Sequence, residues 1–498
     1  MKSRQIFLNA ITTIAQTLGN AGVLFFLYRF LIRSIGMERL GIWSLVLATT
    51  SVITLANQGF STSIIKFVAK YAARENPEEV AVVVQTAVIS VAIGIGVVSL
   101  GLFPAARWIL HVVLPAARLS EAYAILPLAI VSLWINVMEG VLQAGLAGHQ
   151  LITICNYLEF GGGVSYLALT FALVPTRGLL GLAYAQVVQG LGILLLTWLL
   201  LRRRTPALPI VPCRWNRAMF RELGGYGLHF QLITSTQALR EPVTKALIAK
   251  FGGLAMTGFY DLAARWVFVF RELLAQSNQV LIPTVSDLHE RDPKSISLVY
   301  RESYRVIFYL AVPVFACVAL LSPVVSRVWI GRYEPVFIQF AAILAAGWLV
   351  NVLANPAYVA DLGTGQLKWP SIGCIVAATL NVGLGLAAGL RFGGIGVVGA
   401  TAISQAVGYT VIIAAYHVEN QIAFGQLLPR ESWAVVSASI AGAAALLPIF
   451  CSACVRSRFS LFVAEAALGM VLVSLAAMMW RHPMRRQLFL WLYEQAPV

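Results

Sequence analysis

The sequence predicts an all-α polytopic membrane protein with about fourteen transmembrane helices, and its composition and apolar runs are the two observations that predict it. Hydrophobic residues make up 59% of the 498 residues and charged residues only 11%, against roughly 25% charged residues in soluble domains. Apolar runs of about 18 to 27 residues recur, each long enough to cross a hydrocarbon core of about 30 Å. Backbone groups in lipid need internal hydrogen bonds, and the alternating pattern of a β-barrel is missing, so helices are expected.

The apolar windows between charged, proline or glycine breaks define the first six spans in order. They cover residues 7–28, 40–60, 80–103, 122–147, 152–174 and 178–201. The first span follows Lys2 and Arg4 and has no small-residue cleavage site, so it is expected to stay in the mature chain. Between the second and third spans, Ser61 to Glu79 joins apolar residues to Lys66 and Lys70, which suits an amphipathic helix lying on the cytoplasmic leaflet.

The same breaks define eight further spans and an orientation. The spans cover residues 223–245, 254–282, 304–325, 336–359, 368–390, 395–416, 432–451 and 459–480. With a cytoplasmic N-terminus, about 20 of the 36 Lys and Arg residues fall in cytoplasmic loops and tails and about 13 on the other side. This bias predicts a multi-pass membrane protein with both termini in the cytoplasm. Because the excess charge of +15 sits in short loops, membrane lipids explain it, and no nucleic-acid partner is expected.

An internal repeat with an offset of 216 to 218 residues organises the chain. It predicts a six-helix lobe over residues 1–205, a second over 206–420, and two additional helices with a cytoplasmic tail over 421–498. Because six is an even number of spans, the second lobe enters the membrane with the same orientation as the first. The lobes are therefore expected to be related by a pseudo-two-fold axis along the membrane normal, with a cavity between them. The matches are Gly36 with Gly253, Gly41 with Gly258, Asn76-Pro77 with Asp292-Pro293, Gly148 with Gly365, Gly178 with Gly396, and Gly181 with Gly399.

Two neighbouring spans of the second lobe carry embedded charges, which are costly in lipid and mark candidate sites. The residues are Arg240, Glu241 and Lys245, then Asp261, Arg265, Arg271 and Glu272. At 100° per residue, Asp261, Arg265 and Glu272 share one helix face to within about 40°. One interpretation is that Asp261 with Arg265 and Glu241 with Lys245 pair at i,i+4 and join the helices. The other is that Arg240 and Arg271 are an unpaired excess that binds an anion in a cavity, since arginine suits phosphate.

The first span carries a polar stripe whose members lie within about 60° of one helix face. The stripe contains Asn9, Thr13, Gln16 and Asn20, and Arg29 follows near its outer end. Hydrogen bonding between helices and recognition of hydroxyl groups in the cavity both fit this stripe. Arg29 fits either a snorkelling anchor or a substrate contact.

Two embedded carboxylates, Glu139 and Glu159, are candidates for coupling to H+ or Na+ or for buried hydrogen bonding. No cofactor or metal site is expected, because the one C-x-x-C pair, Cys451 and Cys454, has no further ligands nearby. The sequence has neither a phosphate-loop motif nor G-x-S-x-G or H-E-x-x-H, and its loops leave no room for a catalytic domain. A protein other than an enzyme is therefore expected.

Several motifs resemble one family over nearly the whole chain. They are the polar first span with Asn9 and Gln16, the turn from Gly36 to Trp43, and Asn57-Gln58-Gly59-Phe60 leading into the basic segment. In their order, these features resemble the polysaccharide transporter family, the oligosaccharide flippases of the multidrug/oligosaccharidyl-lipid/polysaccharide (MOP) exporter superfamily. The resemblance implies alternating-access transport of a polyprenyl-diphosphate-linked oligosaccharide to the outer leaflet, for cell-surface polysaccharide biosynthesis. Polysaccharide polymerase and export machinery are the partners it implies.

Two other functions stay open at this stage. An ion-coupled multidrug or metabolite exporter of the same superfamily would favour an apolar and acidic cavity, which the embedded Arg and Lys residues argue against. A membrane oligosaccharide polymerase or glycosyltransferase would be expected to carry a long outer loop or paired acidic metal ligands, and the sequence shows neither.

Overall fold

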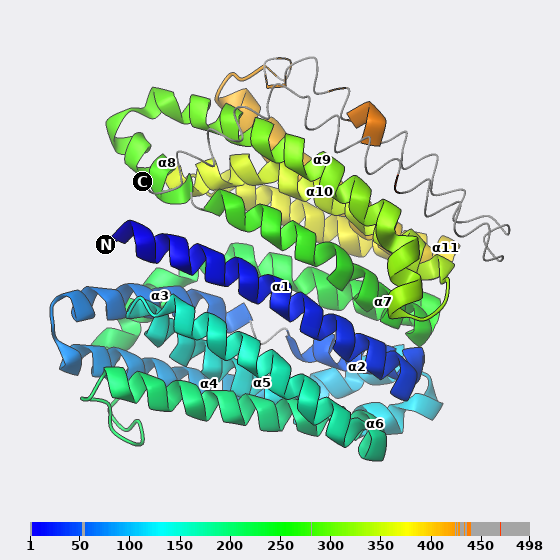
Figure 1. Cartoon of the computed structure of the whole chain (residues 1–498), viewed down its shortest axis with the longest axis horizontal. Coiled ribbons are helices and arrows are strands. Elements are labelled where there is room, and N and C mark those ends of the chain that lie inside the picture. Colours follow the sequence, from blue (N-terminus) through cyan, green and yellow to red (C-terminus); the bar gives the residue numbers. More distant parts are fainter. Residues whose placement is uncertain are drawn as a thin grey trace. The chain divides into compact units, whose positions relative to one another are not determined.

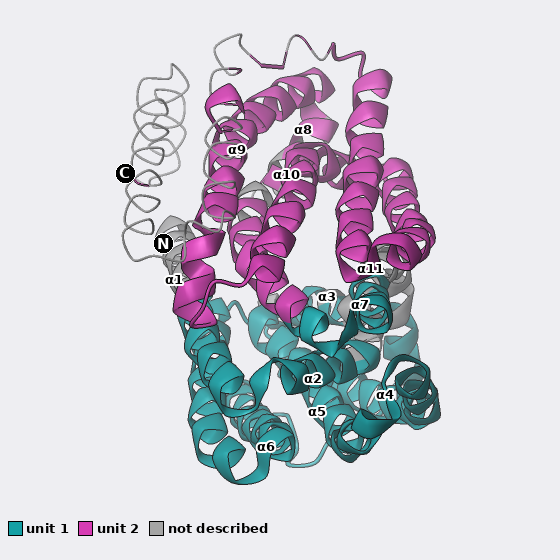
Figure 2. Ribbon diagram, turned by 90° about the vertical axis from the view of Figure 1, so that its right-hand side faces the viewer, with its two compact units in different colours: residues 1–258 teal, residues 259–498 magenta. Residues whose placement is uncertain are grey.

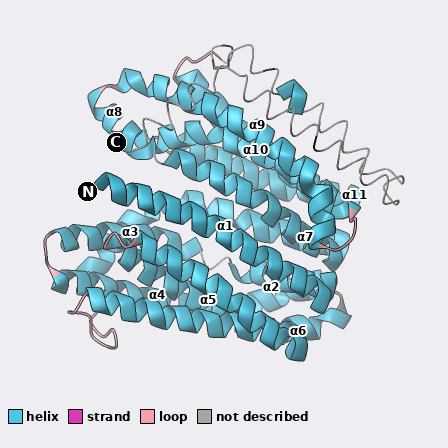
Figure 3. Cartoon of the chain, in the orientation of Figure 1, coloured by secondary structure: helices cyan, strands magenta, loops and turns pink. Residues whose placement is uncertain are grey.

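The computed structural model describes residues 2–51, 55–279, 281–423, 425, 427–428, 433, 436–439 and 469. Side chains are described for most of these residues, but not for residues 2–15, so the side chain of Asn9 lies outside the described part. The helices, labelled in Figure 1, are α1 (Lys2–Ser34), α2 (Gly36–Ser51), α3 (Leu55–Ala73), α4 (Pro77–Val113), α5 (Ala116–Gly148), α6 (Ile152–Arg204), α7 (Arg217–Gln279), α8 (Leu281–Arg291), α9 (Ile296–Trp329), α10 (Pro335–Thr364) and α11 (Lys368–Glu419). The described residues form helices and no strand (Figure 3), which confirms the predicted all-α class.

The chain divides into two compact units, unit 1 over Met1–Gly258 and unit 2 over Phe259–Val498 (Figure 2). Unit 1 has an apolar core made by α3, α4, α5 and α6, with Ile64, Val84 and Leu146 among its buried members. Unit 2 has a more aromatic core made by α9, α10 and α11, with Tyr300, Tyr304 and Tyr416. The predicted boundaries after residues 205 and 420 stay predictions.

Six helices of the described chain are long and apolar enough to cross a membrane. They are α4, α5, α6, α9 with the short turn before it, α10 and α11. The predicted spans 432–451 and 459–480 lie almost wholly outside the described residues, so the number of fourteen stays a prediction.

α6 has 53 residues and would extend about 80 Å as one straight helix, but it is folded back on itself as a helical hairpin. The chain turns at Gly178, whose φ of 55° favours glycine. A Cβ on Gly162, before the turn, would lie 3.0 Å from Gln189 Nε2 and 3.4 Å from Ile193 Cγ1, after the turn. The two halves therefore pack against each other in opposite directions.

The helix boundaries repeat along the chain in agreement with the predicted internal repeat. α4 spans Pro77–Val113, and the turn and helix over Pro293–Trp329 begin and end 216 residues later. Asn76 and Asp292 are both N-caps followed by proline at the first helical position, as their matched dipeptides predict. Gly36 and Gly253, the other matched pair, have φ values of 80° and 83°.

The predicted residue matching between the two repeats is wrong at the turn within α11 that corresponds to the turn within α6. The sequence pairs Gly178 with Gly396, but the residue with the matching backbone is Gly393, with φ of 63°. Gly396 instead corresponds to Gly181, because a Cβ on either glycine would lie 2.3 Å from a carbonyl oxygen eight residues earlier, that of Ala388 or Leu173. Abundant glycines make a three-residue shift hard to detect by letter matching, whereas backbone geometry distinguishes the positions.

The predicted surface position of the Ser61–Glu79 segment is also wrong. The structure places residues 61–73 of this segment in α3, which packs against α4 and α5. Ile64 and Val68 are fully buried, and Val68 fits against Gly148, where a Cβ would lie only 2.6 Å from Val68 Cβ. The apolar face of this helix is covered by protein, while Lys66 and Lys70 remain exposed.

Two glycines allow a close crossing between α2 and the part of α7 that follows its kink at Gly253. A Cβ on Gly41 would lie 2.0 Å from the carbonyl oxygen of Leu254. A Cβ on Gly258 would lie 2.8 Å from the carbonyl oxygen of Met37. Both pairs are related by the 217-residue offset, so the contact is reciprocal and each repeat supplies one glycine.

The turn between α5 and α6 contains His149, whose Nε2 lies 3.0 Å from Thr205 Oγ1. Burial, reinforced by the nearby Arg204, lowers the pKa of His149 below its ordinary value of 6.5. Because the unfolded chain then takes up this proton at a higher pH, stability should be lost as the pH falls below 6.5. We expect acidification to lower the melting temperature of the wild type more than that of His149→Gln, measured by thermal unfolding in detergent. Identical pH dependence of the two proteins would contradict this assignment.

Candidate functional site

The polar stripe of α1 faces α6 in unit 1. Gln16 Nε2 donates a hydrogen bond to Glu159 Oε2 at 2.5 Å. Asn20 lies one turn further along α1, next to Gly163 of α6, where a Cβ would be 3.2 Å from Asn20 Oδ1. Gln16 thus makes the helix-to-helix hydrogen bond that one interpretation of the stripe predicts.

Glu139 joins this group from α5. Its Oε1 accepts a hydrogen bond from Gln143 Nε2 at 2.9 Å, one turn further along the same helix. Glu139 and Glu159 are close enough to interact electrostatically. Unit 1 therefore brings two predicted carboxylates and Gln16 together from three helices, a group we call the acidic cluster, defined as Gln16, Glu139, Gln143 and Glu159. Two nearby carboxylates with amide neighbours attract a proton or a small cation.

The first part of α7 contains the predicted pair of Glu241 and Lys245. The Lys245 ammonium lies 2.8 Å from Glu241 Oε1, which confirms the predicted i,i+4 pairing. Lys245 is 5% exposed, so its charge is held away from solvent within unit 1, while Glu241 is largely exposed. The neighbouring Arg240 is partly buried. Arg29, in α1, is partly buried as well.

After the kink, α7 contains the second predicted pair in unit 2. Arg265 Nε donates to Asp261 Oδ2 at 3.0 Å, again confirming the i,i+4 pairing. Asp261 is only 2% exposed. Next to this pair, Trp266 joins α7 to α9, because its indole N–H donates a hydrogen bond to the carbonyl oxygen of Val318 at 3.1 Å.

Removal of Arg265 should destabilise the protein more than neutralisation of Asp261. Arg265→Ala leaves a buried carboxylate without its guanidinium, whereas Asp261→Asn leaves a cation whose side chain is 35% exposed, so that water can solvate it. The expected loss in free energy of unfolding is about 2 kcal/mol for Arg265→Ala and less than about 1 kcal/mol for Asp261→Asn. Chemical unfolding of both purified variants measures the difference, and an equal or reversed order would count against a buried pair.

Arg271 is not the unpaired cation that one interpretation of the sequence predicts. Its Nη1 lies 2.7 Å from Glu272 Oε2, and its Nε donates to Asn351 Oδ1 at 3.4 Å. The guanidinium also lies over the rings of Phe268 and Trp348, at 5.5 and 5.3 Å from their centroids. Adjacent residues do not usually share a helix face, but two long side chains reach each other here, and α10 supplies the other partners.

The Arg271 guanidinium retains capacity for a ligand. Nη2 has no hydrogen bond among the described residues, and the side chain is 25% exposed. The aromatic contacts and the Glu272 contact fix the plane of the fork, which is the arrangement that recognises oxyanions. We call Phe268, Arg271, Glu272, Trp348 and Asn351 the arginine cluster.

The sequence-predicted residues thus fall into local groups within each unit. Arg240 and Lys245 belong to unit 1, and Arg265 and Arg271 belong to unit 2. Sequence reasoning missed Gln143, Trp348 and Asn351. Asn351 was detectable as a polar residue within the apolar span 336–359, and Gln143 as the i+4 partner of Glu139.

The family model for polysaccharide biosynthesis protein matches residues 30–334. No curated protein sequence is significantly similar to the chain. Among solved structures, the lipid II flippase MurJ in an inward closed conformation has a TM-score of 0.71 at 12% identity, covering 95% of this chain and 99% of MurJ. An inward-facing multidrug resistance MATE family transporter of the MOP superfamily has a TM-score of 0.67 at 17% identity, covering 82% and 96%. A MOP superfamily transporter from Pyrococcus furiosus, described as having a binding pocket of reverse polarity, has a TM-score of 0.60 at 15% identity, covering 83% and 95%.

Proposed function

The chain belongs to the polysaccharide biosynthesis protein family, and from this membership we propose that it is a flippase for a polyprenyl-diphosphate-linked oligosaccharide. The fold is that of membrane transporters of the MOP superfamily. In the proposed reaction, the glycolipid passes from the cytoplasmic to the outer leaflet by alternating access, for cell-surface polysaccharide biosynthesis. Family membership is the observation that carries this proposal, and the full-length similarity to a lipid II flippase supports a lipid-linked substrate.

The arginine cluster suits the charged part of such a substrate. A diphosphate presents several oxygens, and the fork of Arg271 offers N–H groups in a fixed plane. The rings of Phe268 and Trp348 offer apolar faces of the kind that pack on the C–H faces of sugars. Glu272 and Asn351 keep the guanidinium in place when no substrate is bound.

Coupling to an H+ or Na+ gradient is proposed for the acidic cluster. Glu139 and Glu159 are two carboxylates that interact within a helical bundle, so binding of one cation or proton relieves their repulsion. No cofactor is part of the proposal. We also propose that the protein lies in the cell membrane of a bacterium or archaeon with both termini in the cytoplasm, and that polysaccharide polymerase and export machinery are its partners.

Translocation of a fluorescent polyprenyl-diphosphate oligosaccharide in proteoliposomes tests the proposal. Protein-dependent movement between leaflets is expected, and it should be faster with either a proton or a sodium gradient than without one. The double variant Glu139→Gln/Glu159→Gln should lose this acceleration but keep basal movement. Absence of movement across several glycans would refute the proposed substrate class.

The similarity to multidrug resistance transporters favours a second candidate, an ion-coupled exporter of drugs or metabolites. The acidic cluster suits a cationic drug, whereas the arginine cluster does not. Efflux of cationic dyes from cells that express the protein, without glycolipid movement in proteoliposomes, would select this alternative. The length of the glycan recovered from the same proteoliposomes separates transport from a polymerase or glycosyltransferase activity, because only these enzymes would lengthen it.

A further inference from the structure

Unit 1 contains a pocket that belongs to neither cluster described above. It lies where the first turns of α2 and α5 meet the hairpin turn of α6. Its volume is about 460 Å³, large enough for a phosphate with a small attached group. Arg39, Glu121 and Arg177 make its polar side, and Ile125, Leu179 and Leu180 make its apolar side. We call it the hairpin pocket; given a cytoplasmic N-terminus, it faces the outer side of the membrane.

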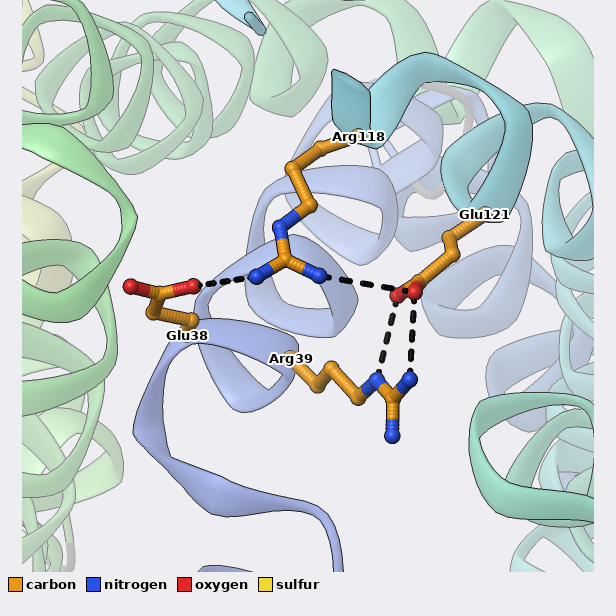
Figure 4. Close-up of polar contacts among 4 residues, drawn as sticks. All are labelled: Glu38, Arg39, Arg118 and Glu121. Atoms are coloured by element: carbon orange, nitrogen blue, oxygen red, sulfur yellow. Dashed lines mark hydrogen bonds and ion pairs between the residues drawn. The ribbon is translucent and has the colours of Figure 1, made fainter.

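A network of ion pairs borders the hairpin pocket (Figure 4). Arg39 Nε and Nη2 donate to the two carboxylate oxygens of Glu121 at 3.3 and 3.2 Å. Arg118 bridges Glu38 at 2.7 Å and Glu121 at 3.5 Å. These two arginines and two carboxylates neutralise each other, and the shared Glu121 holds Arg39 at the pocket wall.

Arg177 adds a positive charge that this network does not neutralise. It is exposed, lies 5.4 Å over the ring of Tyr184, and has no carboxylate partner among the described residues. The pocket therefore has three arginines at or beside it against two carboxylates, and its excess charge is positive. A ligand for this pocket carries an anionic group.

The apolar wall of the pocket continues along the second half of α6. Leu180, Tyr184, Val188, Leu191 and Leu195 follow helical spacing on one face, and each is more than a third exposed. This exposed stripe starts at the pocket and extends along a predicted membrane span. An anionic group next to an apolar stripe in a membrane is the pattern of a lipid with a charged head group and a hydrocarbon chain.

The matching turn of unit 2 also has an arginine, but its pocket lacks the ion-paired carboxylate of the hairpin pocket. A pocket of about 480 Å³ lies beside Gly396, with Leu384, Phe392 and Ile403 in its wall. Arg391 is its only charged lining residue, and no carboxylate lines it. Two turns of the same construction therefore differ in that only the hairpin pocket combines two arginines with a carboxylate that orients one of them.

We propose that the hairpin pocket binds an anionic phospholipid of the outer leaflet, with Arg177 and Arg39 as ligands of the head-group phosphate and the α6 stripe as the seat of an acyl chain. Arg39 shifts part of its hydrogen bonding from Glu121 to the phosphate, while Arg118 keeps Glu121 neutralised. This site is separate from the arginine cluster and does not depend on which substrate the protein transports.

Native mass spectrometry of the purified full chain with added phosphatidylglycerol tests the site. Loss of a charged hydrogen-bond donor in Arg177→Gln should weaken retention of the lipid about tenfold. Leu180→Gln should weaken phosphatidylglycerol retention too, but not binding of inorganic phosphate. The matched control Arg391→Gln, at the equivalent turn of unit 2, should retain phosphatidylglycerol as the wild type does.

Three results would overturn the proposal. They are unchanged retention in Arg177→Gln, an equal loss in Arg391→Gln, and displacement of phosphatidylglycerol by an equal concentration of inorganic phosphate. The last result would identify a free-anion site. Each variant is compared only after it elutes as one peak and melts at the wild-type temperature. Should Arg177→Gln fail this check, Arg177→Lys and Arg39→Gln serve in its place, and wild-type retention in both would equally refute the site.

Discussion

Arg271→Ala should reduce glycolipid translocation at least tenfold without preventing membrane insertion. In the proposed site the side chain would supply two or more charge-assisted hydrogen bonds to a diphosphate, and each is worth about 1.5 to 3 kcal/mol. Its loss also leaves the partly buried Glu272 as a repulsive neighbour for an anionic substrate. The measurement is the rate of movement in proteoliposomes, normalised to the amount of folded protein.

Two control variants separate binding from structure. Arg332→Ala removes an exposed arginine in the turn after α9, paired with Glu334 at 2.9 Å, and should leave transport unchanged. Arg271→Ala/Glu272→Gln removes the stranded negative charge, so it should recover part of the rate if repulsion contributes. Wild-type transport by a well-folded Arg271→Ala protein would remove the arginine cluster from the substrate path.

Gly41→Ala should cause the largest loss of stability of any glycine-to-alanine change at the crossing of α2 and α7. The new Cβ would lie 2.0 Å from the Leu254 carbonyl oxygen, and backbone cannot rotate away as a side chain can. Overpacking of this kind costs about 1 to 3 kcal/mol, and the upper end is expected here. Thermal unfolding in detergent, followed by fluorescence-detected gel filtration, measures the effect.

The chain provides a graded series for comparison. Gly258→Ala should cost less, since the contact there is 2.8 Å from the Met37 carbonyl oxygen. Gly94→Ala, in α4, has nothing within 4 Å and should be neutral or stabilising because alanine favours helix. Equal melting temperatures across the three variants would show that the backbones can separate at no cost.

The spacing of charged residues along the sequence predicted the ion pairs within one helix, but it did not predict which residues of other helices these side chains contact. The pairs of Asp261 with Arg265 and Glu241 with Lys245 follow from the i,i+4 geometry of any helix. The contact of Gln16 with Glu159 spans 143 residues, and that of Arg271 with Asn351 spans 80. No periodicity within one segment carries information about such distances.

By itself, the sequence determined the all-helical membrane class, the repeat and the polar faces of its helices, because each depends on composition, run length or helical period. Only the tertiary structure decided that the buried face of α3 packs against protein, that the chain turns at Gly393 and not at Gly396, and that Arg271 is paired. These features depend on which backbones approach each other and on the φ of single residues. Packing determines both, and it acts between residues that are far apart along the chain.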